Sequence, residues 1–331
     1  MENEMEKVLL CTINDNEHLG QILSTYALHV TLQNLGYCPV VFDDLCRMNT
    51  VISKYIKERC CLFSDMCIHN SKEKYLDTFN YLLTGAEKKW KYTEKESTDQ
   101  CFLNFGKEDA RKIAYAPSFG KRCDIPLGPK NAAIFALKRF DGISVEDNST
   151  LRILNMEFGI DAEKVCSPLF LVEDYPHFDR EEIEGLFLSV FFEDRDNQKQ
   201  KVVEMSEEIL QYRIIDLSKD IENHLDSSID VFLNALEKGA LIITDSIAFA
   251  HMAVVYKKPF ILITSRLGDA AGTLSGLESL GLMERVIYTE DDVCEKKYLC
   301  RKPIRYGLVD YKLMELRSKS IRWLEEKLKK E

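Results

Sequence analysis

Short apolar runs alternate with helix-forming segments along the whole chain, and this alternation constrains the fold more than any other feature of the sequence. In the first half, strands are expected at residues 8–12, 39–42, 80–84, 112–116 and 142–145. Helices are expected at residues 20–35, 128–140 and from Asn148 to Gly159. Residues 165–171 are expected to be extended around Pro168. This alternation predicts a parallel sheet covered by helices.

The alternation starts again after a polar, acidic stretch at residues 173–184, which carries Pro176 and is interpreted as a domain linker. Strands are then expected at residues 186–192, 213–216, 241–244 and 259–264. Helices are expected at residues 199–211, 229–237, 247–255 and 313–328. The sequence therefore predicts two Rossmann-like domains, residues 1–172 and 185–308, with residues 309–331 as a C-terminal helix that packs back on the body.

The composition narrows the classes of function. The 331 residues fit two domains, and 44 basic against 55 acidic residues give a net charge of −11. An acidic balance argues against a nucleic-acid partner and against docking on anionic lipid through a basic face. No apolar run is long enough to span a membrane, and the acidic start does not resemble a secretory signal, so we expect a cytoplasmic protein.

The eleven cysteines include no C-x-x-C pair, which argues against a metal site built on them. Several lie inside apolar runs and are expected to be small buried hydrophobic residues: Cys11, Cys67, Cys101 and Cys166.

Ligands of parallel α/β sheets bind beyond the carboxyl ends of the strands, so the loops at those ends hold the candidate residues. We predict substrate-binding roles, without a metal ion, for Asn14, His18, Gly20, Gly85, Ser118, Glu146, Ser246, Arg266 and Gly272. Two residues near the end of the strand at 241–244 are the catalytic candidates: Asp245 and His251.

Each main candidate has a structural alternative. The helix that follows Asp245 and Ser246 can hold an anion at its free N–H groups, or these side chains can simply cap it. His251 can serve as an acid or base, or it can be a buried, hydrogen-bonded histidine. Arg266 can pair with a phosphate or carboxylate, or it can be a surface arginine. Ser118 can contact a ligand, or it can belong to an ordinary turn.

Five segments, taken together and in order, resemble the polysaccharide pyruvyl transferase family. They are residues 19–28 (LGQILSTYAL) with 35–37, residues 79–90, residues 112–120 (KIAYAPSFG), residues 143–147 (ISVED), and residues 232–246 with 258–260. The resemblance implies two Rossmann-like domains facing across a cleft, as in the GT-B architecture. It also implies transfer of a pyruvyl group from phosphoenolpyruvate to a sugar diol of a bacterial surface glycan or its precursor, with no cofactor.

The sequence departs from the family pattern where the chemistry would lie. Glu146 stands at the family's arginine position, Ala248 stands at its histidine position, and Gly85 begins GAEK instead of the family's Gly-Ser-Asp-Gln. The residues that shape the fold match the family, whereas those that would carry out the reaction differ. This pattern indicates that the chain keeps the family's fold and favours a changed reaction.

Three hypotheses follow. The chain can be a pyruvyl transferase-like enzyme of surface-glycan biosynthesis acting on a sugar or glycan-precursor acceptor. It can be a non-catalytic relative that binds a glycan precursor or a partner enzyme. It can also be a glycosyltransferase with a nucleotide-sugar donor.

Overall fold

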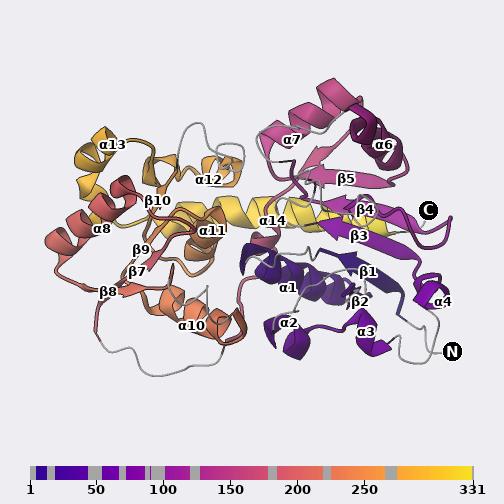
Figure 1. Cartoon of the computed structure of the whole chain (residues 1–331), viewed down its shortest axis with the longest axis horizontal. Helices are drawn as coiled ribbons and strands as arrows, with labels where there is room; N and C mark the ends of the chain where they lie inside the picture. The colour runs from indigo at the N-terminus through magenta and orange to yellow at the C-terminus, as the bar shows by residue number, and fades with distance from the viewer. Residues whose placement is uncertain are drawn as a thin grey trace. The chain divides into compact units, whose positions relative to one another are not determined.

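The structure is a computed structural model that describes residues 5–12, 19–43, 54–66, 72–85, 90, 101–119, 127–177, 185–218, 225–264 and 274–329. The chain divides into two units (Figure 1). Unit 1 comprises Met1–Val172 together with Glu315–Glu331, and unit 2 comprises Glu173–Met314.

Unit 1 is built on a parallel sheet with the strand order β2-β1-β3-β4-β5-β6. The strands are β1 (Lys7–Cys11), β2 (Cys38–Val41), β3 (Tyr81–Gly85), β4 (Arg111–Tyr115), β5 (Gly142–Val145) and β6 (Glu163–Lys164). All of β3 and nearly all of β1 and β4 is buried, as expected for strands covered on both faces.

The described helices of unit 1 connect these strands. They are α1 (Leu19–Asn34), α2 (Lys54–Arg59), α3 (Phe63–Met66), α4 (Lys72–Leu76), α6 (Leu127–Leu137) and α7 (Asn148–Arg152). Helix α1 contacts β2 and α2, and α7 contacts β5 (Figure 1). A π-helical turn at Ile153–Phe158 continues α7 and ends at Gly159, whose φ of 63° lies in the left-handed region that glycine tolerates.

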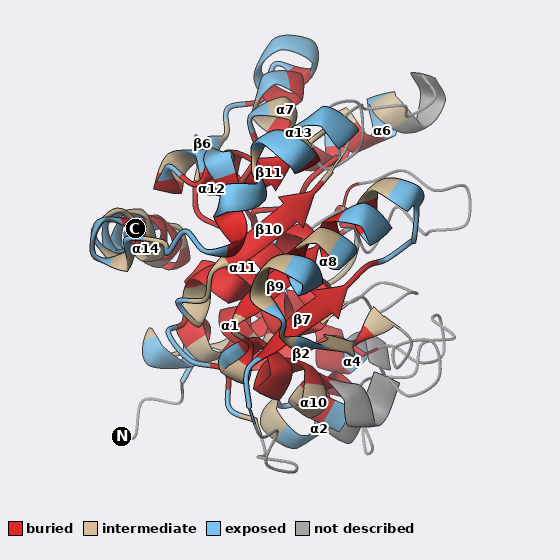
Figure 2. Cartoon of the chain, turned by 90° about the vertical axis from the view of Figure 1, so that its left-hand side faces the viewer, coloured by how far each residue is buried: buried red, intermediate tan, exposed pale blue. Residues whose placement is uncertain are grey.

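Unit 2 contains a parallel sheet with the order β11-β10-β9-β7-β8. Its strands are β7 (Phe187–Phe191), β8 (Arg213–Asp216), β9 (Leu241–Thr244), β10 (Phe260–Ile263) and β11 (Val286–Ile287). Its helices include α8 (Asn197–Leu210), α10 (Leu225–Lys238), α11 (Ile247–Val255), α12 (Ser275–Leu280) and α13 (Glu290–Glu295). Every residue of β7, β9 and β10 is buried, and these strands form the red centre of this unit in Figure 2.

The long helix α14 (Tyr306–Leu328) contributes residues to both units. Its later part completes the core of unit 1 through Trp323, Leu324 and Leu328, which are all buried. The indole Nε1 of Trp323 donates to Glu163 Oε1 at 3.1 Å. Unit 1 is therefore assembled from two segments far apart in the sequence.

The predicted class of two parallel-sheet α/β domains is confirmed, with two local corrections. The expected extended segment at residues 165–171 is wrong, because Pro168–Phe170 forms a 3₁₀ turn. Proline fixes φ near the helical value and suits the first position of such a turn. The expected C-terminal helix begins earlier, at Tyr306, and the expected boundary at residue 309 lies inside it.

The cysteine expectation is confirmed for Cys11, Cys101 and Cys166, which are buried free thiols, while Cys67 lies outside the described residues. Within the described parts of the chain, no cluster of three or more His, Cys, Asp or Glu side chains could hold a metal ion. No helix in these same parts is both long and apolar enough to cross a membrane.

Candidate functional site

The topology of unit 2 places a crevice at the carboxyl ends of β7 and β9. Strand β7 lies between β8 and β9, so the connections that leave β7 and β9 run to opposite sides of the sheet. Such a reversal is where open parallel sheets bind their ligands. The residues that follow these strands, Phe192–Asp196 by sequence after β7 and Asp245 and Ser246 after β9, therefore form the candidate site.

Asp245 links the two connections. Its Oδ1 accepts the backbone N–H of Glu193 at 2.8 Å, and its Oδ2 accepts a hydrogen bond from Lys199 Nζ at 2.7 Å. The side chains of Asp245 and Lys199 are each only 10% exposed, so their interaction is screened far less than a surface ion pair. Asp245 thus lies at the carboxyl end of β9, and its carboxylate is already engaged.

Lys199 is the central cation of this crevice. Besides Asp245, its ammonium contacts the carboxylate of Asp194, lies 3.6 Å from Asp196 Oδ2, and donates to the backbone oxygen of Asp194 at 3.0 Å. One ammonium among three carboxylates leaves the group with a net negative charge, which disfavours an anionic ligand at Lys199 itself.

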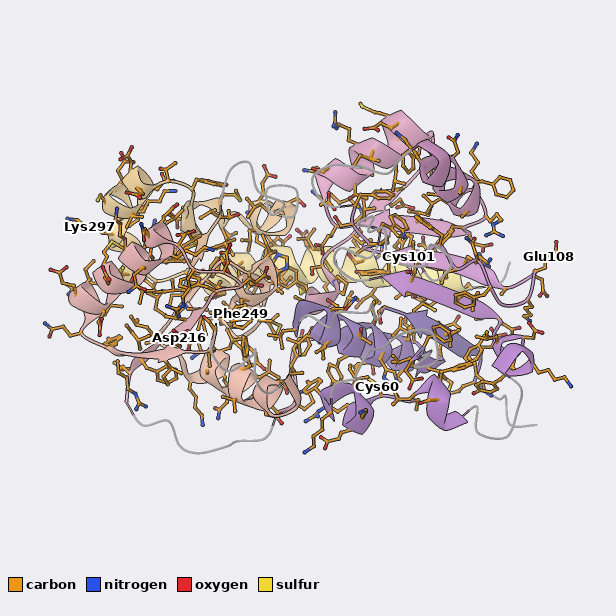
Figure 3. All side chains as sticks on the ribbon, viewed as in Figure 1. Cys60, Cys101, Glu108, Asp216, Phe249 and Lys297 are labelled. Carbon is orange, nitrogen blue, oxygen red and sulfur yellow. The ribbon has the colours of Figure 1, made fainter. Side chains whose placement is uncertain are left out.

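A cavity of about 240 Å³ lies beside Lys199, at the first turn of α8. It is lined by Phe192, Arg195, Asp196, Asn197, Lys199 and Gln200. The cationic groups of Arg195 and Lys199 lie 5.8 and 5.9 Å from the centre of the Phe192 ring, within the range of a cation–π interaction. Arg195 also pairs with Asp216, which is labelled in Figure 3.

The N-terminus of α11 lies directly after Asp245 and has no side-chain cap. Ser246 is the N-cap residue, and its hydroxyl makes no capping hydrogen bond. By contrast, Asp147 accepts from Thr150 N at 2.7 Å and caps α7, while Asp196 accepts from Lys199 N at 2.8 Å and caps α8. The capping alternative proposed for Ser246 is therefore wrong. The first N–H groups of α11 are not capped by Ser246 and can bind an anion.

Aromatic packing fixes this helix end on the sheet. Phe249, in the first turn of α11 and labelled in Figure 3, stacks on Phe191 at the end of β7 with ring centres 4.3 Å apart. It also makes an edge contact with Phe232 of α10 at 4.0 Å. The free N–H groups are thereby held in a defined position, which lowers the entropic cost of binding a ligand there.

His251 lies in the middle of α11 and is buried, with 2% of its surface exposed. Desolvation by burial lowers the pKa of its imidazole to about 3, so the ring is neutral near pH 7. The surroundings of His251 are therefore those of the buried histidine that was given as the structural alternative. Proton transfer by His251 stays a prediction, and it would require access that the described structure does not provide.

The predicted residues of unit 1 are only partly brought together. Gly20 is buried in the first turn of α1, and Gly85 ends β3, where an added Cβ would lie 2.6 Å from the backbone oxygen of Tyr115. The Ser118 hydroxyl is buried and lies 3.3 Å from Thr150 Oγ1. Glu146 follows β5 and is 6% exposed. The predicted residues Asn14, His18, Arg266 and Gly272 lie outside the described residues.

A buried polar network at the carboxyl end of β1 was not anticipated. The Thr12 and Thr25 hydroxyls lie 2.7 Å apart, and Gln21 Nε2 donates to the backbone oxygen of Thr12 at 2.8 Å. Lys199 was missed as well. A lysine in an amphipathic helix usually faces solvent, and the only sequence signal was its position one turn after the acidic residues Asp194 and Asp196.

Comparisons with known proteins identify the architecture. No family model and no curated protein matches the sequence. A Listeria monocytogenes structure provisionally assigned as a UDP-N-acetylglucosamine 2-epimerase has a TM-score of 0.56 at 10% identity, over 92% of this chain and 90% of that one. UDP-GlcNAc 2-epimerase from Neisseria meningitidis bound to UDP-GlcNAc has a TM-score of 0.52 at 10% identity, over 97% and 99% of the two chains.

A glycosyltransferase from Rickettsia africae has a TM-score of 0.50 at 13% identity, over 96% of this chain and 94% of that one. At these identities the likeness concerns the fold alone. It confirms the predicted GT-B-like class of two Rossmann-like domains.

Proposed function

We propose that this protein is a sugar-modifying transferase of glycan biosynthesis that takes a nucleotide sugar as its donor. The main observation in its support is the uncapped N-terminus of α11. This helix follows β9, next to the point where the strand order of the unit 2 sheet reverses. A phosphate oxygen placed there would accept hydrogen bonds from the Ser246 hydroxyl and from the first N–H groups of α11. The shared fold with a UDP-GlcNAc-bound epimerase and with a glycosyltransferase supports this proposal.

The charge of Asp245 next to this helix end is partly offset, although Lys199 also pairs with Asp194 and Asp196. Lys199 Nζ and the N–H of Glu193 both bind its carboxylate. The positive end of the α11 dipole would favour a phosphate at the first N–H groups of this helix.

In the proposed reaction, an acceptor hydroxyl of a sugar attacks the anomeric carbon of the donor. The bond from that carbon to the phosphate oxygen breaks, and the bond to the acceptor oxygen forms while the hydroxyl proton passes to a base. The α11 N–H groups stabilise the negative charge that develops on the leaving nucleotide.

Binding at Ser246 provides a direct test. We expect nucleotide sugars such as UDP-GlcNAc to raise the melting temperature, since a ligand of the folded state stabilises it. Replacing Ser246 with alanine should weaken binding about tenfold, because one hydrogen bond to a charged group is lost. Ser279→Ala in α12 is the matched control, since its hydroxyl donates to the Ser275 backbone oxygen of the same helix. Absence of any stabilisation by nucleotide sugars, or equal binding by both variants, would contradict the proposal.

Pyruvyl transfer is the second candidate, favoured by the ordered motif matches around residues 112–120. The α11 N-terminus would suit the phosphate of phosphoenolpyruvate equally well. Glu146 argues against it, because this buried residue is acidic at the position where the family has an arginine. Phosphate release from phosphoenolpyruvate in the presence of glycan acceptors distinguishes the two reactions. Binding of a glycan precursor without turnover of either donor would identify a non-catalytic relative.

A further inference from the structure

One ammonium group joins the two connections that form the candidate site of unit 2. Lys199, in the first turn of α8, donates to the backbone oxygen of Asp194 at 3.0 Å, within the connection that follows β7. The same ammonium lies 2.7 Å from Asp245 Oδ2, in the connection between β9 and α11. Because the Lys199 side chain is only 10% exposed, these contacts are largely shielded from water. Lys199 therefore fixes one connection against the other.

Of the three carboxylates around this ammonium, that of Asp245 depends on it most. The side chains of Asp194 and Asp196 are 81% and 54% exposed, so water solvates their charges. The Asp245 side chain is only 10% exposed. A carboxylate withdrawn from water requires a charged partner and hydrogen bonds, and Lys199 supplies that charge.

The hydrogen bonds of Asp245 direct its carboxylate toward the connection that follows β7. Its Oδ1 accepts the backbone N–H of Glu193 at 2.8 Å, and Lys199 Nζ donates to its Oδ2 at 2.7 Å. Asp245 nevertheless lies one residue before the N-cap of α11, where the helix dipole attracts a negative charge. In unit 1 a carboxylate between a strand and a helix does cap the helix, since Asp147 accepts from Thr150 N at 2.7 Å. Asp245, once released, is therefore a competing acceptor for the first N–H groups of α11.

We propose that Lys199 is a positioning residue for the donor of the proposed function, on which this inference rests. Lys199 acts through Asp245. It holds the carboxylate against the β7 connection and so leaves the first N–H groups of α11 open to a phosphate. The ammonium does not bind the phosphate itself, because three carboxylates already share its charge. Loss of Lys199 releases a carboxylate that competes with the phosphate and repels it.

Calorimetric titration of the full chain with UDP-GlcNAc and, separately, with inorganic pyrophosphate tests this role. Lys199→Met should weaken the binding of both probes about fivefold or more, because the released carboxylate occupies N–H groups that the phosphate needs. Lys201→Met is the matched control and should leave both affinities unchanged. Lys201 lies on the same helix, is 53% exposed and pairs with Glu290.

Removal of the Asp245 carboxylate separates positioning from a merely structural role. Asp245→Ala alone should bind both probes more tightly than the unmodified protein, since a negative charge beside the site is removed. The Lys199→Met, Asp245→Ala double variant should recover the affinity that Lys199→Met loses. If the ion pair only held the two connections together, or if Lys199 bound the phosphate directly, the double variant would bind as weakly as Lys199→Met.

Thermal melts establish that each variant is folded at the titration temperature. Lys199→Met leaves a carboxylate that is only 10% exposed without its cation, so this variant carries the greatest risk of unfolding. If it does not fold, Asp245→Ala and the double variant decide the question, because neither contains that carboxylate.

The outcomes distinguish this role from the proposed function. Equal affinity of Lys199→Met and the unmodified protein, or weaker binding by Asp245→Ala, overturns the positioning role while nucleotide-sugar binding stands. Binding of pyrophosphate without tighter binding of UDP-GlcNAc overturns the nucleotide-sugar donor, and the pyrophosphate titrations then decide the positioning role. If neither probe binds the unmodified protein, both proposals are overturned.

Discussion

Two buried histidines, His29 and His251, make the stability of the fold depend on pH. Burial lowers the pKa of His251 to about 3 and that of His29 to about 4, against 6.5 for the exposed side chain. Both rings stay neutral in the folded protein at pH values where the unfolded chain takes up protons. The contribution of these two imidazoles to stability is therefore complete above about pH 6.5. It decreases as the pH falls toward their pKa values in the folded protein.

For His251 the loss amounts to about 2 kcal/mol between pH 7.5 and pH 5. We expect the free energy of unfolding from urea titrations to decrease over this interval, and His251→Asn should remove about half of the decrease. An unchanged pH dependence in the variant would show that the pKa of His251 is the same in the folded and unfolded states. The raised pKa of Asp147 acts with the opposite sign at more acid pH, so measurements stay above pH 5.

Two glycines, Gly85 and Gly142, give a second prediction for single residues. A Cβ at residue 85 would lie 2.6 Å from the backbone oxygen of Tyr115, and the parallel pairing of β3 with β4 prevents that oxygen from moving away. Gly85→Ala should therefore cost about 1–3 kcal/mol. Gly142→Ala is the comparison, because its Cβ would meet the flexible side chain of Lys327. Equal melting temperatures for the two variants would contradict this account.

Among the elements, the helix N-termini of unit 2 differ in how they are capped. Asp196 caps α8, so Asp196→Ala should lower the free energy of unfolding by about 1 kcal/mol. Ser246→Ala at the uncapped α11 should change it by only a few tenths of a kcal/mol, although the same substitution is expected to weaken donor binding. Chemical denaturation measures both. A large stability loss in Ser246→Ala would mean that its hydroxyl is a structural cap after all.

Sequence patterns located most elements, because alternation of strands and helices depends on local periodicity. The strands at Gly142–Val145, Arg213–Asp216 and Leu241–Thr244 match their predicted bounds. The two-residue strands β6 and β11 were not foreseen, since their pairing comes from neighbouring strands and not from their own residues.

The site was less predictable than the fold. The position of Asp245 and Ser246 after a buried strand places them at the carboxyl end of β9, because that placement follows from topology. The cluster around Lys199 could not be foreseen, since it joins β7, α8 and β9 through side-chain geometry. The missing cap at Ser246 likewise depends on a side-chain orientation that a capping-type residue does not specify.

In the whole molecule, both tryptophans, Trp90 and Trp323, belong to unit 1. Tryptophan fluorescence therefore reports on unit 1, whereas far-ultraviolet circular dichroism reports on both units. Leu233 is fully buried in unit 2, and Leu233→Ala should destabilise that unit by about 2–5 kcal/mol. We expect the dichroism transition to shift and broaden while the fluorescence midpoint stays in place. Equal shifts by both probes would mean that the two units unfold together.

The two-segment construction of unit 1 also affects how the chain folds as it is synthesised. Residues of unit 2 are contiguous, so all of them are translated before the last segment of unit 1. The core of unit 1 stays incomplete until Trp323 and Leu324, which are buried in it, have been synthesised. The part of the protein that emerges first is thus completed last, which reverses the usual N-to-C order of domain maturation.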